Sequence, residues 1–271
     1  MSFFEGLLRL CNAEMTVPTL YGWFHLLSLG ITAAVTILLC RTHKKGDDAH
    51  VRRVILFTAV LVMILELYKQ FIHTFSYSDE IKLSYQWYIF PWQFCSTPMY
   101  AGLIAGLTKK GRIHNAACAY LATYALFAGL CVMFYPGDVY TYQIGINIQT
   151  MVCHGSMVAI AIYLLYSGYV KVDKKTFLSA SAVFAVAVGI AVILNEIAHL
   201  TGITENHNFN MFFVSPHRPP SLPVYSIVQQ YVPYPFCLFI YIIGFSLAVA
   251  LIMLAAKGIT HLANKRKKAT V

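Results

Sequence analysis

Charge is scarce in this chain: Asp, Glu, Lys and Arg make up 11% of its 271 residues, whereas 58% are hydrophobic. Polar stretches long enough for a soluble domain are missing, because the apolar residues come in runs of about twenty, the length that crosses roughly 30 Å of hydrocarbon. This composition excludes an ordinary soluble domain. It predicts an all-α, polytopic membrane protein in which residues 1–271 form a single transmembrane domain.

Several other features are also absent. The seven cysteines lack the paired spacing of a disulfide framework or a zinc site, so neither a disulfide nor a bound metal is predicted. Residues 1–19 have no basic segment followed by a long apolar stretch, so no cleavable signal peptide is expected. Apolar side chains at Phe3, Phe4, Leu7 and Leu8 instead share one side of a helix, which predicts a short interfacial helix.

The apolar runs predict seven spans, at residues 20–40, 54–75, 86–107, 114–134, 144–166, 177–199 and 234–256. Sixteen Lys and Arg residues follow the odd-numbered spans, whereas Arg9, Lys82 and Arg218 alone lie on the other side. The positive-inside rule therefore predicts an outside N-terminus and a cytoplasmic C-terminus. This bias and attraction to an anionic inner leaflet explain the net charge of +9 without a nucleic-acid partner. The bias and short loops favour a bacterial plasma membrane, and the sequence sets no oligomeric state.

Polar residues inside the spans gather towards their outer halves. Their spacing places them on single helix faces: Glu66, Lys69 and His73 on the second span, Gln143, Asn147, Thr150 and His154 on the fifth, and Asn195 and His199 on the sixth, with His25 on the first. Ionisable groups in hydrocarbon are costly unless they face protein or a wet cavity, so these residues predict a polar cavity open to the outer leaflet. A purely structural interpretation stays open, with His25 and His199 as interhelical hydrogen-bonding groups and Glu66 and Lys69 as an internal ion pair.

Cys95 differs from the other intramembrane cysteines because Pro91 and Pro98 bracket it. Each proline removes a helical N–H and strains the preceding turn. Broken backbone at membrane depth is tolerated only where it is buried in protein or lines a cavity. The segment around Gln93, Cys95 and Thr97 is therefore predicted to place a thiol, hydroxyls and an amide beside a cavity, although simple kinking explains the prolines equally well.

The outer connection 200–233 is rich in proline and aromatic residues, which argues against a disordered loop and predicts a cap over that cavity, with a passive interfacial loop as the alternative. His207, Asn210, His217 and Arg218 are candidates for contacting a lipid phosphate, while solvated loop positions are the simpler interpretation of each.

Several segments together resemble a known family. They are Phe24-His-Leu-Leu27, Phe90-Pro-Trp-Gln-Phe-Cys95, Cys153-His-Gly155, the stretch from Asn208 to Pro216, and Val232-Pro-Tyr-Pro235. Their order and spacing resemble the bacterial YwaF-like integral membrane family, which is similar to the animal transmembrane lysophospholipid acyltransferases that work without coenzyme A.

The resemblance implies that a fatty acyl group moves from a donor phospholipid to a lysophospholipid in the bilayer, with no cofactor. By motif position, Cys95 matches the family's catalytic cysteine and His154 its histidine. Bacterial relatives usually carry His two residues before the cysteine, where this chain has Gln93, so His154 is expected to act as the base. A thiol needs a base or cation to become a nucleophilic thiolate, and the oxyanion of the intermediate needs donors, for which Gln93, Asn195 and Lys69 are candidates.

Two other functions stay open. A membrane lipid hydrolase would use Thr97 or Ser96 as its nucleophile. A proton-coupled transporter would use Glu66, Lys69, His73 and Glu196 to bind a small solute. Transporters place their sites near the midplane, and the outward skew of the polar residues disfavours that alternative.

Overall fold

The computed structural model describes residues 3–43, 47–77, 80–202, 208–218 and 222–269, and these are mostly helical. Six helical segments are long and apolar enough to cross a membrane, namely α2 (Trp23–Thr42), α3 (Asp48–Ile72), Arg112–Phe134, α7 (Ile144–Tyr166), α8 (Lys174–Leu200) and Tyr234–Gly258, which belongs to α10 (Tyr234–Ala269). Each of these helices matches one predicted span, and most of their ends agree to within a few residues. The agreement is expected because the length of the apolar run determines both the predicted span and the helix. The multi-pass membrane architecture is therefore confirmed.

The predicted span at 86–107 is not a continuous helix, so seven transmembrane helices are not confirmed. It begins with a 3-10 turn, η1 (Trp87–Ile89), continues irregularly, and becomes helical only in α4 (Thr97–Leu107). The physical reason is the two prolines. Pro98 occupies the first turn of α4, where its missing N–H has no partner to lose, and the Pro91 carbonyl accepts a 2.8 Å hydrogen bond from the Tyr100 hydroxyl. Pro91 thus lies in the irregular half of the segment.

The short helix α4 packs closely against α3. A Cβ on Gly102 would lie 2.8 Å from the Ala59 Cβ, and one on Gly106 would lie 2.7 Å from the Leu56 Cβ. These distances are shorter than side chains tolerate, so the two glycines allow the helices to approach. This contact holds the irregular half of the segment next to the outer half of α3.

The third long segment contains a π-helical turn. It comprises α5 (Arg112–Tyr120), the π turn η2 (Leu121–Ala125) and α6 (Leu126–Phe134). Such turns hold one residue more than an α-helical turn and are frequent at functional sites. Here the turn begins directly after Tyr120, whose hydroxyl contacts Thr97.

The elements on the predicted outer side are short. They are α1 (Phe3–Cys11), the antiparallel strands β1 (Phe75–Tyr77) and β2 (Ile81–Leu83), the 3-10 turn η3 (Met211–Phe213) and α9 (Pro223–Tyr231). The helix predicted at the start of the chain is confirmed by α1, whereas the hairpin was not predicted. The predicted cap 200–233 contains η3 and α9, and its residue His207 lies outside the described residues.

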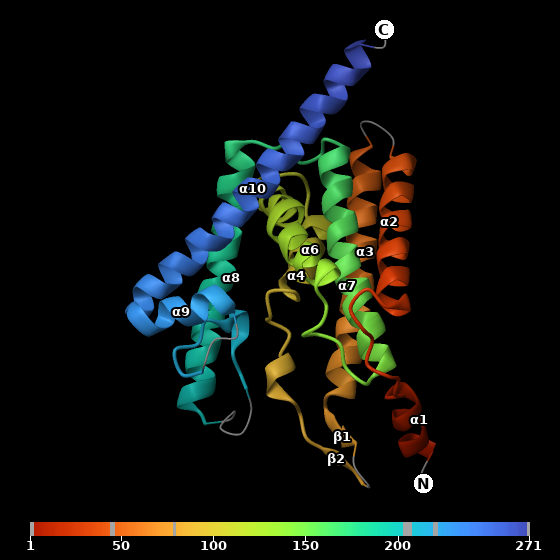
Figure 1. Ribbon diagram of the computed structural model, residues 1–271, viewed down its shortest axis with the longest axis vertical. Coiled ribbons are helices and arrows are strands. Elements are labelled where there is room, and N and C mark those ends of the chain that lie inside the picture. The colour runs from red at the N-terminus through yellow and green to blue at the C-terminus, as the bar shows by residue number, and fades with distance from the viewer. Residues whose placement is uncertain (1–2, 44–46, 78–79, 203–207, 219–221, 270–271) are drawn as a thin grey trace.

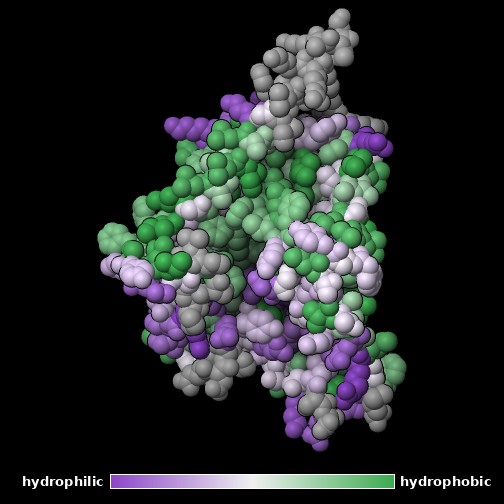
Figure 2. Space-filling model, viewed as in Figure 1, coloured by the Kyte–Doolittle hydropathy of each residue, from purple (hydrophilic) through white to green (hydrophobic). Residues whose placement is uncertain are grey.

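α7 lies at the centre of the bundle, in contact with α2, α3 and α6, while α8 packs against α5 (Figure 1). The long α10 crosses the bundle at an angle, and α8, α9 and α10 form a separate side of the molecule. Figure 2 shows a hollow between this side and the rest, with apolar residues above and hydrophilic residues at its lower rim. The hollow gives the interior of the bundle a polar opening at one end.

The first turn of α8 is capped by Asp173, whose carboxylate accepts a 2.8 Å hydrogen bond from the Thr176 backbone N–H. This bond lowers the pKa of Asp173 below its ordinary value. We expect Asp173→Ala to destabilise the protein by about 1 kcal/mol, whereas Asp173→Asn, which still caps, should retain most of that stability. The pKa is depressed in the folded state, so the carboxylate's contribution is present above the ordinary Asp pKa and is lost as pH falls through the lowered value. Thermal unfolding in detergent across that acidic range measures both effects.

Candidate functional site

Cys95 lies in the irregular half of the broken span and is half-buried. Its thiol is 3.8 Å from the Gln93 Oε1, a weak contact, and the Gln93 Nε2 donates a 2.7 Å hydrogen bond to the Tyr88 carbonyl. Backbone turns fix the position, because the N–H groups of Ser96 and Thr97 both donate to the Gln93 carbonyl, at 2.9 and 3.2 Å. The two prolines thus produce an ordered turn that presents the thiol.

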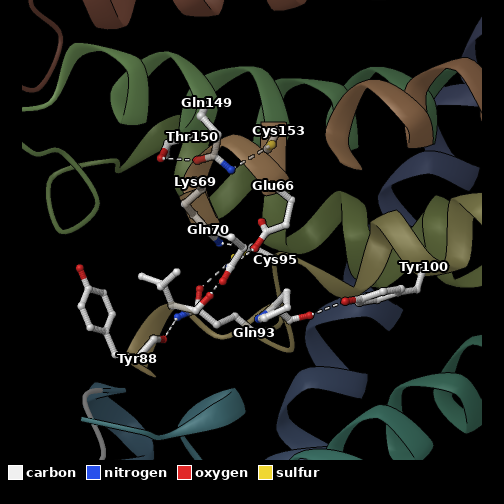
Figure 3. Close-up of polar contacts among 12 residues, drawn as sticks. Glu66, Lys69, Gln70, Tyr88, Gln93, Cys95, Tyr100, Gln149, Thr150 and Cys153 are labelled. Carbon is white, nitrogen blue, oxygen red and sulfur yellow. Dashed lines mark hydrogen bonds and ion pairs between the residues drawn. The ribbon is translucent and has the colours of Figure 1, made fainter. Parts of the chain in front are cut away.

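A buried ion pair on α3 lies beside this turn. The Lys69 ammonium is 2.9 Å from the Glu66 carboxylate, and their side chains are 10% and 7% exposed. Gln70 donates to the same Glu66 oxygen at 2.7 Å and to the Ile89 carbonyl at 2.8 Å, so the pair is tied to η1. The pair predicted from the i, i+3 spacing is therefore present, and Figure 3 shows it beside the turn that carries Cys95.

Figure 3 shows how α3 and α7 contribute to the same cluster. Glu66 and Lys69 lie between the turn that carries Cys95 and the α7 side chains of Gln149 and Cys153. The Gln149 Nε2 donates to the Cys153 sulfur at 3.4 Å, and Cys153 packs against Val62 and Met99. The polar interior predicted from the sequence thus forms where α3, α7 and the broken span meet.

His154 is buried, and its hydrogen bond fixes its tautomer. The Nδ1 lies 2.7 Å from the Thr150 carbonyl oxygen, which can only accept, so Nδ1 carries a proton. In the neutral ring, Nε2 then has the free lone pair. Nε2 makes no hydrogen bond with the described residues, and it keeps some accessible surface although the residue is buried. This is the protonation pattern of a general base.

The two predicted catalytic residues lie on different elements, Cys95 in the irregular half of the broken span and His154 on α7. Among the described residues no hydrogen bond joins Cys95 to His154 directly. Catalytic hydrogen bonds are often long or absent without substrate and tighten when it binds. The structure therefore places Cys95 beside the Glu66–Lys69 pair and His154 on α7, without a hydrogen bond between the two among the described residues.

The two hydroxyls next to Cys95 have different surroundings. The Thr97 hydroxyl donates to the Phe94 carbonyl at 2.9 Å and lies 2.6 Å from the Tyr120 hydroxyl, so its proton is already engaged in a hydrogen bond. The Ser96 Oγ is buried and has no hydrogen-bond partner in the described structure. Of the two, Ser96 has the hydroxyl free to bind a new acceptor.

Residues 20–256 match the sequence model of the TMEM164 family. The chain belongs to this family. The match includes five of the six long helices in full, α10 as far as residue 256, the broken span and both Cys95 and His154. Comparison with curated proteins gives no match, and comparison with solved structures gives none either.

Three predicted cavity residues of this TMEM164-family chain have structural partners. Asn195 on α8 holds the outer loop at both ends of its amide: it donates to the Met211 carbonyl at 3.1 Å and accepts from the Met211 N–H at 2.8 Å. Asn147 holds Thr141 in the same way, at 2.8 and 2.9 Å. His25 accepts from the Tyr21 N–H and therefore donates through Nε2 to a carbonyl. The amides of Asn195 and Asn147 are thus occupied rather than free for an oxyanion.

The predicted head-group residues lie on the loop before α9, whose Phe209 and Phe212 pack against Phe90 and Phe94 in the segment that carries Cys95. The His217 Nε2 is 3.1 Å from both Glu196 carboxylate oxygens, and its ring stacks on His199 with centroids 3.5 Å apart. Asn210 accepts from the Ser215 N–H at 2.9 Å, which stabilises the loop itself, and Arg218 is half-buried. The structure gives Asn210 a loop-forming role and groups His199 with His217.

Sequence reasoning missed part of the site. Tyr120, Gln70 and Gln149 all contact predicted residues or their neighbours. Gln70 and Gln149 each lie one residue from a predicted position, and Gln149 is four residues before Cys153, a spacing that places both on one helix face. That spacing is a usable signal, whereas nothing in the sequence pairs Tyr120 with Thr97.

The Asn195 clamp gives a testable prediction about the loop. Asn195→Leu removes both hydrogen bonds to the buried Met211 backbone, which leaves its N–H and carbonyl unpaired at a cost of about 1–3 kcal/mol each. We expect faster proteolysis within the outer loop and a lower melting temperature. Asn208→Leu, in the same loop but exposed, is the control. Equal cleavage of the two variants would contradict the clamp.

Proposed function

We propose that this protein is a membrane acyltransferase that moves a fatty acyl group from a phospholipid to a lysophospholipid, with Cys95 as nucleophile and His154 as general base. One observation carries the proposal: the tautomer of His154 leaves a basic Nε2 without a hydrogen-bond partner among the described residues, on the helix that contributes Gln149 and Cys153 to the cluster beside Cys95. The resemblance to coenzyme-A-independent acyltransferases supports the same assignment.

The first half-reaction forms a thioester. The His154 Nε2 takes the proton from the Cys95 sulfur, and the thiolate attacks the carbonyl carbon of the donor ester. The C–S bond forms, the ester C–O bond breaks, and the leaving alkoxide takes the proton from His154. In the second half-reaction, the acceptor hydroxyl gives its proton to His154 and attacks the thioester, and the released thiolate recovers that proton.

The oxyanion of each tetrahedral intermediate requires donors close to Cys95. The Ser96 hydroxyl is adjacent in sequence and unpaired, and a rotation of this side chain out of its sealed position is needed for it to fill this role. Loss of one such donor typically raises the barrier by about 3–4 kcal/mol. Gln93 is held by Tyr88 and contacts the thiol through Oε1, so its position favours orientation of the sulfur.

The site is proposed to open towards the outer leaflet of a plasma membrane, with the N-terminus outside and the broken span completing seven crossings. The basic-residue bias carries the orientation. A hydrolase that uses Thr97 is disfavoured because Tyr120 and the Phe94 carbonyl occupy that hydroxyl. Exclusion of water by bound lipid favours transfer over hydrolysis at Cys95.

The direct test is acyl transfer by the purified protein. A phospholipid labelled in its acyl chain, mixed with a lysophospholipid and no coenzyme A, is expected to yield labelled diacyl product. Label trapped on the protein should be released by hydroxylamine at neutral pH, as thioesters are. Label that appears only as free fatty acid would identify a hydrolase, and no turnover of either kind would overturn the proposal.

A further inference from the structure

A groove of about 680 Å³ runs between α2 and α3, with α7 as its floor. α2 and α3 each pack against α7, as Figure 1 shows, yet within the described ranges they scarcely touch each other. Small residues of α7, including Ser156 and Ala159, line the middle of the floor, and Gly155 allows the Thr32 side chain of α2 to pack close to α7. The groove is therefore built into the packing of three helices.

The groove is long and lined chiefly by apolar side chains. On α2 it extends from Trp23 to Leu39, and the sixteen steps between them span about 24 Å at 1.5 Å per residue. This is most of the roughly 30 Å thickness of a bilayer's hydrocarbon core. Leu27 and Ile31 on its wall are more than half exposed, so the groove faces lipid. A narrow apolar channel of this length fits an extended acyl chain.

Positive charge is placed at one end of the groove. His50 and Arg53 line it near the start of α3, on the side that the basic loops predict to be cytoplasmic, and their i, i+3 spacing puts them on one face. The His50 Nε2 is buried without a hydrogen-bond partner. Arg53 makes one long bond, from Nε to the Ala49 carbonyl at 3.4 Å, so its terminal nitrogens have no partner among the described residues.

The acidic residues nearby face elsewhere. Asp47 and Asp48 line a separate polar cavity between α3, α5 and α8, and Asp48 is paired there with Lys110 at 2.8 Å. Asp47 also caps α3 by accepting from the His50 backbone N–H. The start of α3 therefore presents its acidic side chains to one cavity and His50 and Arg53 to the groove, while Arg52 donates to the Gly106 carbonyl.

We propose that this groove binds one membrane phospholipid, with the phosphate at His50 and Arg53 and one acyl chain lying along α7 towards Trp23. A phosphate accepts strong, charge-assisted hydrogen bonds from arginine, whose two parallel donors match its geometry, and a turn of the His50 ring brings its unpartnered Nε2 out of its sealed position to the same phosphate. Trp23, at the far end, carries no charge, so the lipid comes from the leaflet on the basic side. The groove uses Gly155 and Ser156, whereas Cys153 packs towards α3 and α4, so this site is distinct from Cys95 and does not depend on acyl transfer.

The test is lipid retention by the full-length protein. The protein is reconstituted with phosphatidylcholine, extracted in mild detergent and weighed by native mass spectrometry. The wild type is expected to carry one phospholipid, and the double variant His50→Phe/Arg53→Gln to retain it at least about tenfold less, as loss of charge-assisted hydrogen bonds predicts. Ile31→Trp, which fills the groove, should also lose it. Arg41→Gln and Ile37→Trp, which lie on α2 outside the groove, should retain it, and so should Cys95→Ser.

Equal retention by the double variant and the wild type would overturn the proposal. The proposal would also be overturned if the wild type carried no lipid, if the bound molecule had no phosphate, or if a second copy of the chain occupied the groove. The two proposals are tested by different measurements. Lipid retention by His50→Phe/Arg53→Gln tests this site, and acyl transfer by Cys95→Ser, which should still retain lipid, tests the catalytic proposal.

Discussion

Cys95→Ala is expected to reduce acyl transfer by about 10³-fold or more, to background. The reason is that no other group in the mechanism forms the covalent intermediate, and loss of a nucleophile that works with its base removes the function of both. His154→Ala should lower the rate by about 10²–10⁴-fold, the usual contribution of a general base. The double variant should be no worse than Cys95→Ala alone. The measurement is initial transfer rate at saturating lipid.

Cys153→Ser is the matched control for this experiment. It removes a buried thiol that belongs to the same cluster and is adjacent to His154 in sequence, and serine keeps a group for Gln149 to contact. Its transfer rate should stay close to that of the wild type. A Cys153→Ser protein that loses activity while Cys95→Ala keeps it would reassign the nucleophile to α7.

Lys69→Met is expected to cause the largest loss of stability. It leaves the Glu66 carboxylate buried with Gln70 as its remaining hydrogen-bond donor, and breaking a buried pair from one side costs about 3–5 kcal/mol. At roughly 2 °C or more per kcal/mol, the melting temperature should fall by about 10 °C. The double variant Glu66→Gln/Lys69→Met removes both charges and should recover most of the loss.

The exposed pair of Lys82 and Glu80 provides the comparison. These side chains are 70% and 78% exposed, and their atoms are 3.2 Å apart. Screening by water leaves such pairs worth about 0–1 kcal/mol, so Lys82→Met should barely change the melting temperature. If Lys69→Met behaved like Lys82→Met, the ion pair beside Cys95 would not be structurally important.

The sequence predicts the long helices because a run of about twenty apolar residues has few alternatives in a bilayer. It also predicts distortion near Cys95, since Pro91 and Pro98 remove two helical donors. It does not predict that the helix begins only at Thr97. That outcome depends on hydrogen bonds such as the one from Tyr100 to the Pro91 carbonyl, which form only after the chain has folded.

For the site, too, some contacts can be predicted from the sequence and others cannot. The spacing of Glu66 and Lys69 predicts their ion pair, because both partners lie on one helix. The partners of Asn147 and Asn195 come from loops, six and sixteen residues away, and no periodicity specifies them. Their polar side chains therefore resemble cavity residues in the sequence, although in the structure they hold loop backbone in place.

The π-helical turn at Leu121–Ala125 has a consequence for how this helix tolerates changes in length. Deletion of one residue within it would restore an ordinary α-helical turn and leave the orientation of α6 unchanged. Deletion one turn later would rotate the rest of α6 by about 100°. Gly129, where a Cβ would lie 3.0 Å from the His154 carbonyl oxygen, would then turn away and a larger side chain would face α7. The additional residue of the π-helical turn thus determines which face of α6 packs against α7, the helix that carries His154.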